Sequence, residues 1–134
     1  MADKINFELV SPERLLMSTT ADMVQVPGAE GDFGVMAGHT PVVSTLRPGL
    51  VEVQDGSDVT QLFVRGGLAE VSQTNLTILA EEAIPFEELK LSDLDQRLKD
   101  LEEDIADAKT DEVRAAAQLA YGQLKQVRDT VASA

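Results

Sequence analysis

Residues 76–108, LTILAEEAIPFEELKLSDLDQRLKDLEEDIADA, contain the change of hydrophobic period that decides the fold. Before Pro85, apolar residues alternate with polar ones, which is typical of strands with one buried face. After Pro85 they recur every three or four residues, as on one face of an α-helix. The members of this helical stripe are Leu91, Leu94, Leu98, Leu101, Ile105 and Ala108. We therefore expect a β domain over residues 1–85 and a helical domain over residues 86–134.

Short β segments, separated by glycine- and proline-rich turns, extend back from Pro85 to Ile5. Strands of four to six residues at spacings of about 8–12 residues indicate an all-β sandwich or barrel. The segments are Ile5–Leu9, Met23–Val26, Leu50–Val53, Thr60–Val64, Leu68–Val71 and Leu76–Ala80. Asp55–Gly56 is the strongest hairpin signal, because glycine accepts a positive φ. A strand break is expected at Gly66–Gly67.

The helical part contains a second apolar stripe. Its members are Val113, Ala117, Ala120, Leu124, Val127 and Val131. Only Lys109–Thr110–Asp111 separates the two stripes, and so short a connection predicts an antiparallel helical hairpin. Ser92 and Thr110 are the expected N-caps of the two helices. Because alanine and valine remove little apolar surface from water, we expect the hairpin to be less stable than the β domain.

The composition excludes several classes of protein. The 134 residues include 24 acidic and 11 basic side chains, and this net charge of −13 argues against binding to nucleic acid or anionic lipid. With no cysteine and one histidine, the chain lacks disulfides, thiolate nucleophiles and multi-histidine metal sites. No apolar run approaches the ~18 residues of a membrane span, and Met1–Asn6 is not a signal peptide. We expect a cytoplasmic location with no direct membrane insertion, and attachment to a membrane only through other proteins.

No sequence motif indicates catalysis. Phosphate-binding loops, dinucleotide-binding glycine motifs and nucleophile elbows are all missing. His39 could act as a general base, but no serine or cysteine shares a catalytic motif with it, so a histidine in a turn or interface is the simpler interpretation. Glu30 and Asp32 could form an acid–base pair or bind a cation, against the alternative of a polar turn. We predict no active site, no metal site and no cofactor.

The segment Pro27–Pro41 contains more glycine than a turn requires. It holds four glycines and two prolines in fifteen residues. Glycines at this density suit tight backbone turns and the close approach of another surface. Two interpretations remain open from the residues alone, a compact loop of the sandwich and an interface with a partner.

At this loop the sequence resembles the epsilon subunit family of bacterial F-type ATP synthases, called delta in mitochondria. The resemblance extends over about residues 5–85. The stretches that carry it are Leu9–Arg14, Pro27–Val35, Gly38–Pro41, Leu46–Gly49, Gly66–Val71 and Thr77–Glu81. Ala37 departs from the family, which often has proline before Gly-His. The helical hairpin matches the family in layout and length more than in residues.

The resemblance implies a ten-stranded β-sandwich followed by a two-helix hairpin. It also implies a non-catalytic rotor subunit of the central stalk, peripheral on the cytoplasmic face of the bacterial inner membrane. Such a subunit couples rotation of the c-ring, driven by proton transport, to the gamma subunit during ATP synthesis. By resemblance, Glu30, Gly31 and Asp32 face the c-ring and His39 faces gamma. Asp32 could pair with an arginine of the c-ring loops.

In some relatives the hairpin contacts the alpha/beta catalytic head and blocks ATP hydrolysis, or it binds ATP. The ATP-binding relatives have Asp-x-x-Arg-Ala in the first helix, whereas here only one residue separates Asp95 from Arg97. Contact with the acidic head favours a basic last helix. Residues 113–134 have three bases and one acid, a net charge of only +2. We expect weak inhibition at most and no nucleotide site.

Two other classes of protein compete with this interpretation. The first alternative is a standalone acidic β-sandwich that binds a ligand. Aromatic residues make up only 4% of the chain and tryptophan is absent, so platforms for stacking a ligand are scarce. The second alternative, an enzyme, has no constellation of residues to support it.

Overall fold

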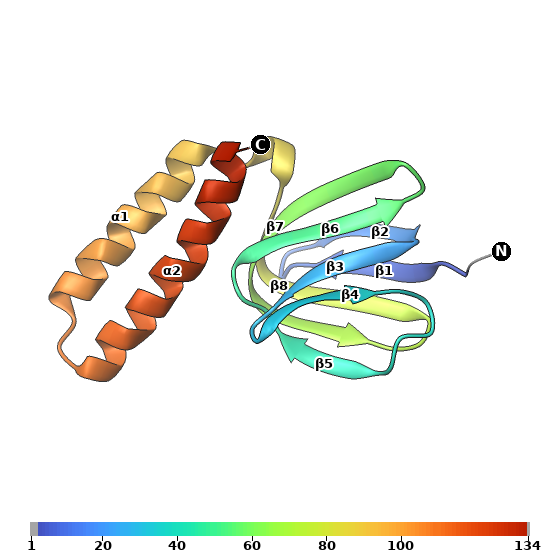
Figure 1. Ribbon diagram of the computed structural model, residues 1–134, viewed down its shortest axis with the longest axis horizontal. Helices are drawn as coiled ribbons and strands as arrows, with labels where there is room; N and C mark the ends of the chain where they lie inside the picture. The colour runs from blue at the N-terminus through green and yellow to red at the C-terminus, as the bar shows by residue number, and fades with distance from the viewer. Residues whose placement is uncertain (1–2, 134) are drawn as a thin grey trace. The chain divides into compact units, whose positions relative to one another are not determined.

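The computed structural model describes residues 3–133. The chain divides into two compact units, one ending at Glu87 and the other beginning at Glu88. The first unit is built of strands and the second of two antiparallel helices, as Figure 1 shows.

Eight strands in the described residues form one hydrogen-bonded sheet that curls into a sandwich (Figure 1). The order across the sheet is β2-β1-β8-β7-β6-β3-β4, and β5 pairs with β7. The strands are β1 (Ile5–Val10), β2 (Leu15–Ala21), β3 (Met23–Gly28), β4 (Gly31–Val35), β5 (Val42–Thr45), β6 (Gly49–Asp55), β7 (Asp58–Val71) and β8 (Asn75–Pro85). The expected count of ten strands is therefore wrong for the described part of the chain.

The difference in strand number arises because β7 and β8 are long and bend. The expected break at Gly66–Gly67 is a bend inside β7, where the two residues have φ of 71° and 100°. The first half of β7 pairs with β6, and the second half pairs with β5. β7 is thus one continuous strand that pairs with both β6 and β5, whereas the sequence pattern predicts two separate strands here.

The same bend changes which side chains face the core. Leu62 and Val64 point into the core before the glycines, and Ala69 and Val71 point into it after them. The inward positions therefore switch from even to odd numbers, although the pairing of β7 with β8 keeps its register. Because side chains alternate strictly along a regular strand, only an irregular backbone here lets both halves cover one core.

The core itself follows the alternation that the sequence predicts. Ile5, Phe7 and Leu9 on β1 are fully buried, and so are Leu76 and Ile78 on β8. These residues belong to a single hydrophobic cluster that draws on both long strands and their neighbours. The described residues include no buried polar or charged side chain, so the interior is wholly apolar.

The second unit contains α1 (Leu91–Asp107) and α2 (Asp111–Ser133), preceded by the short 3-10 helix η1 (Phe86–Glu88). The Thr110 hydroxyl accepts a hydrogen bond from the Val113 amide at 3.1 Å, which confirms Thr110 as the cap of α2. The expected cap Ser92 is wrong. Lys90 occupies the N-cap of α1 without a side-chain hydrogen bond, and Ser92 lies inside the first turn.

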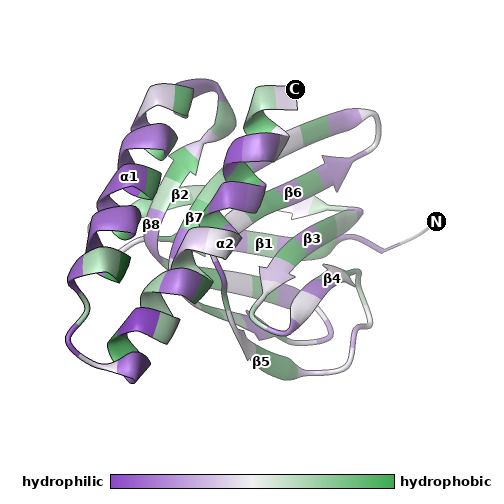
Figure 2. Cartoon of the chain, turned by 60° about the vertical axis from the view of Figure 1, so that its left-hand side comes forward, coloured by the Kyte–Doolittle hydropathy of each residue, from purple (hydrophilic) through white to green (hydrophobic). Residues whose placement is uncertain are grey.

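Polar contacts join the two helices along their length. The Arg128 Nε donates to Asp95 Oδ1 at 2.8 Å, and the Tyr121 hydroxyl donates to Glu102 Oε1 at 3.1 Å. Both helices alternate hydrophilic and hydrophobic residues, as the colours of Figure 2 show. None of the described helices is long and apolar enough to span a membrane.

Candidate functional site: the groove beside β4 and β5

A third of the glycine-rich segment forms a strand of its own. Gly31–Val35 forms β4 and pairs with β3, with Phe33 opposite Val26 and Val35 opposite Val24. The alternation of Phe33 and Val35 with small or polar neighbours supplies the inward face that a strand needs. The loop that remains between β4 and β5 is residues 36–41.

Arg47 holds the turn between β3 and β4 in place. Its Nη2 lies 2.5 Å from Asp32 Oδ1, and its Nη1 donates to the Gly28 carbonyl at 2.8 Å. The Ala29 amide also donates to the Thr45 carbonyl at 2.9 Å. A guanidinium presents several donors in a rigid fork, so one side chain fixes both the carboxylate and the backbone of the turn.

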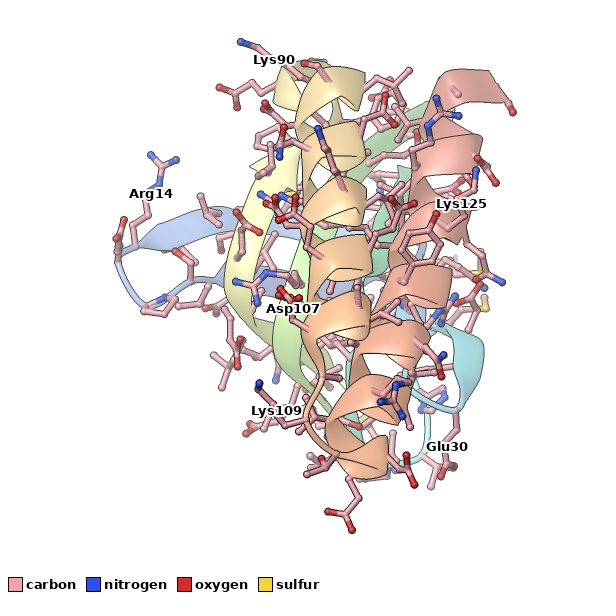
Figure 3. All side chains as sticks on the ribbon, turned by 90° about the vertical axis from the view of Figure 1, so that its left-hand side faces the viewer. Arg14, Glu30, Lys90, Asp107, Lys109 and Lys125 are labelled. Carbon is pink, nitrogen blue, oxygen red and sulfur yellow. The ribbon has the colours of Figure 1, made fainter. Side chains whose placement is uncertain are left out.

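The four residues that the sequence singles out lie together. Glu30, Gly31, Asp32 and His39 line one open groove of about 530 Å³ on the first unit. The remaining lining residues are Phe33, Thr40, Pro41, Val42 and Ser44. Glu30 and Asp32 are exposed, and Figure 3 labels Glu30 at its place on the chain. The groove is therefore lined both by carboxylates and by the apolar side chains of Phe33, Pro41 and Val42.

His39 is oriented by its own loop. Its Nδ1 lies 2.7 Å from the Thr40 carbonyl oxygen, and because a carbonyl only accepts, Nδ1 is the protonated nitrogen. Its ring also lies beside Phe33, with 6.5 Å between the ring centroids. In the neutral ring, Nε2 is then the acceptor that His39 can offer to another molecule.

The arrangement suits recognition more than proton transfer. The contacts found for His39 are with backbone and with an aromatic ring, and Asp32 is paired with Arg47. Among the described residues, no group of three or more acidic or histidine side chains is placed to hold a metal ion. Arg47 is not among the site residues predicted from the sequence, although it lies in the Leu46–Gly49 turn that carries part of the resemblance.

Comparison with known proteins identifies the family. The family model described as "ATP synthase, Delta/Epsilon chain, beta-sandwich domain" matches residues 4–86. The ATP synthase epsilon chain of Parvibaculum lavamentivorans is 52% identical over 98% of this chain and 100% of its own length. That of Paramagnetospirillum magneticum is 49% identical over 100% of this chain and 98% of its own.

Solved structures give the same result for the fold. A chain of the Euglena gracilis mitochondrial ATP synthase, in the assembly of OSCP, F1 and c-ring, has a TM-score of 0.79 and 25% identity. The match covers 96% of this chain and 81% of that one. A chain of the Tetrahymena thermophila mitochondrial ATP synthase, from the central stalk and c-ring, matches in fold with a TM-score of 0.64 and 11% identity.

The described chain is a β-sandwich with a surface turn fixed by Arg47, followed by a helical hairpin, which is the architecture expected for a delta/epsilon chain. The full-length matches are all to one such subunit. The chain belongs to the ATP synthase epsilon chain family, whose members are non-catalytic subunits of that complex. These matches do not favour a standalone ligand-binding module.

Proposed function

We propose that this chain couples rotation of the c-ring to the gamma subunit in a bacterial, proton-translocating F-type ATP synthase. The observation that carries the proposal is the 52% identity to an epsilon chain over 98% of this chain and all of that one. The likeness to a chain of the Euglena gracilis assembly, which includes a c-ring, supports it. In this role the protein is a peripheral subunit on the cytoplasmic face of the inner membrane.

In the proposed assembly Glu30, Gly31 and Asp32 face the c-ring and His39 faces gamma. They line one groove, in which Glu30, Gly31 and Asp32 are exposed and His39 is half-buried, and this supports a role in binding. Asp32 already has Arg47 as a partner, whereas Glu30 has no ion pair among the described residues. Glu30 is therefore the carboxylate more available to a basic side chain of the ring. An exposed pair of this kind contributes little binding energy and mainly sets the register of the two surfaces.

The sandwich suits the transmission of torque because its interior is closely packed. A single apolar cluster joins β1, β3, β6, β7 and β8, and the described residues bury no polar side chain. Such interiors have low compressibility and pass strain from one surface to another. A torque applied to one face of the sandwich therefore reaches the other face with little deformation of the interior.

The hairpin acts as a weak inhibitor at most in this proposal, through contact with the alpha/beta catalytic head. α2 carries three basic side chains that could meet an acidic surface, but each already has an acidic partner within the hairpin. Arg114 pairs with Asp111, Lys125 with Asp129, and Arg128 with Asp95. Little unpaired positive charge remains to attract the head. Asp95, the first residue of the imperfect nucleotide motif, is likewise engaged by Arg128, which supports the absence of an ATP site.

The proposal is tested by measuring ATP hydrolysis in the assembled complex with the full-length chain and with a chain ending at Glu88. We expect hydrolysis to stay within about twofold, because a weak brake changes the rate little when it is removed. A several-fold rise would contradict the weak-inhibitor part and make the hairpin a strong brake.

Purification of the tagged chain from membranes tests the rotor part separately. We expect gamma and the c-ring to co-purify with it, and a Glu30→Gln, Asp32→Asn variant to retain less c-ring than a control changed at exposed Glu13. Recovery of the chain without either partner would contradict the rotor role.

A further inference from the structure

The turn of residues 28–32, between β3 and β4, is held by hydrogen bonds to the segment that joins β5 to β6. The Ala29 amide donates to the Thr45 carbonyl at 2.9 Å. The Arg47 amide donates to the Pro27 carbonyl at 3.1 Å. These two backbone bonds place the 28–32 turn beside Arg47.

The backbone next to Arg47 is in turn fixed to the core. Leu46 is buried in the hydrophobic cluster of the sandwich, and its amide donates to the Gly67 carbonyl at 3.1 Å. Gly67 lies at the bend of β7. The Arg47 side chain therefore extends from a backbone whose position is set by the core.

The Arg47 side chain gives the two carboxylates of the turn different roles. Its Nη2 pairs with Asp32 and its Nη1 donates to the Gly28 carbonyl, while the side chain itself is only 21% exposed. Glu30 is exposed and has no ion pair among the described residues. One carboxylate is thus neutralised within the chain, and the other keeps its charge for another molecule.

We propose that Arg47 is the positioning residue of the 28–32 turn, which holds Asp32 within the chain and leaves Glu30 as the one carboxylate offered to a basic side chain of the c-ring. This inference rests on the proposed function, which supplies the c-ring as the partner. A turn that is already ordered loses less conformational entropy on binding than a free one. Arg47 does not contact the ring in this arrangement, and it acts through Glu30.

The opposite arrangement would make Arg47 a competitor of the ring. Asp32 would then bind a basic side chain of the ring, and Arg47 would first have to leave it. The geometry argues against this exchange, because the same guanidinium also binds the Gly28 carbonyl and both bonds fix the turn. The two arrangements predict opposite signs for Arg47→Ala, a weaker affinity if Arg47 positions the turn and a stronger one if it competes.

The first measurement is the affinity for the purified c-ring of a complex assembled from alpha, beta, gamma and this chain. We expect Arg47→Ala to weaken binding about threefold at low salt, which is the scale of one partly exposed ion pair. Arg47→Lys should fall between this variant and the native chain, because an ammonium lacks the fork of donors. Arg14→Ala, at an exposed arginine between β1 and β2, is the matched control and should keep the native affinity. Unchanged or stronger binding by Arg47→Ala would overturn the proposal.

A double-variant cycle shows whether Arg47 acts through Glu30. Glu30→Gln alone is expected to weaken binding to the ring about threefold. Arg47→Ala added to Glu30→Gln should cause little further loss, because the carboxylate that Arg47 positions is then neutral. Losses that simply multiply would overturn the proposal, since they would show that Arg47 acts independently of Glu30.

Binding to gamma separates a positioning role from a general loss of structure. We expect Arg47→Ala to bind a complex of alpha, beta and gamma within about twofold of the native chain, and circular dichroism to show that it folds. An equal loss of affinity for that complex and for the ring would overturn the positioning role. Failure of the unaltered chain to strengthen binding to the ring would instead overturn the proposed function. Native affinity of Arg47→Ala for the ring would leave the proposed function standing.

Discussion

At the scale of single residues, Gly67 is the glycine at which an added Cβ would make the closest contact. Its φ is 100°, and a Cβ built on it would lie 1.8 Å from the Leu79 carbonyl oxygen. We expect Gly67→Ala to destabilise the sandwich by about 3 kcal/mol, because an unfavourable φ and a clash with backbone act together. Urea denaturation followed by circular dichroism measures this loss.

Gly56→Ala is the control for the backbone part of that effect. Gly56 has a φ of 62°, and nothing lies within 4 Å of the Cβ that a substitution would add. Its expected cost is about 1 kcal/mol, which is the price of a left-handed conformation without a clash. Equal losses in the two variants would contradict the importance of the close contact with β8.

Tyr121 reports on the closure of the helical hairpin. The hydrogen bond to the Glu102 carboxylate raises the pKa of Tyr121 above its usual value of about 10. The stabilisation from this bond is therefore fully present below pH of about 10 and is lost as pH rises through the higher folded pKa. Because the chain has one tyrosine and no tryptophan, an ultraviolet titration observes this group alone.

Glu102→Gln should lower the pKa of Tyr121 toward its ordinary value, since a neutral amide no longer disfavours the phenolate. Glu103→Gln changes the neighbouring exposed acid and serves as the control. A pKa that is the same in the Glu102→Gln variant and the native chain would show that the helices are not held together at this point in solution.

At the scale of elements, the turn between β3 and β4 depends on one side chain from outside it. Arg47 pairs with Asp32 and donates to the Gly28 carbonyl. We expect Arg47→Ala to lower the free energy of unfolding by about 1–2 kcal/mol. Asp32 loses its ion-pair partner, and the Gly28 carbonyl loses a hydrogen-bond donor. Arg47→Lys should recover only part of this, because an ammonium is a point charge without the fork of a guanidinium.

Hydrogen exchange locates the effect of Arg47→Ala. The Ala29 amide, which donates to the Thr45 carbonyl, should exchange faster in the variant while amides in β1 keep their rates. Arg14→Ala removes an exposed arginine on the turn between β1 and β2, as the labelled side chain in Figure 3 shows, and should leave Ala29 unchanged. Unchanged exchange at Ala29 in both variants would contradict the anchoring role of Arg47.

At the scale of the whole molecule, the chain divides into two compact units at the boundary between Glu87 and Glu88. The sandwich has a wholly apolar core that includes fully buried phenylalanine, whereas the second helix relies on alanine, valine and polar pairs. All residues of the sandwich core precede Glu88, so removal of the hairpin at Glu88 deletes none of them. A change in hydrolysis on truncation is assigned to the hairpin once circular dichroism shows that the truncated chain folds.

Local patterns in the sequence were sufficient for the elements whose stability is local. The helical stripe from Leu91 to Ala108 identifies α1, Thr110 identifies the start of α2, and Asp55–Gly56 identifies the hairpin between β6 and β7. In each case neighbouring residues supply the signal, through side-chain periodicity, a cap or a positive φ. Ser92 was wrong because α1 begins one residue before it, at Leu91, so Lys90 occupies the N-cap position.

The division into a β domain and a helical hairpin, the alternating core positions and, through a resemblance, the epsilon chain family can all be predicted from the sequence. Strand pairing shows that Gly66–Gly67 bends one strand instead of separating two. β6 pairs with the first half of β7, and β5 pairs with the second half of the same strand. Only the tertiary structure shows that Arg47 pairs with Asp32. These features join residues distant along the chain, and their register is set by pairing and burial across the whole sheet, which no local pattern contains.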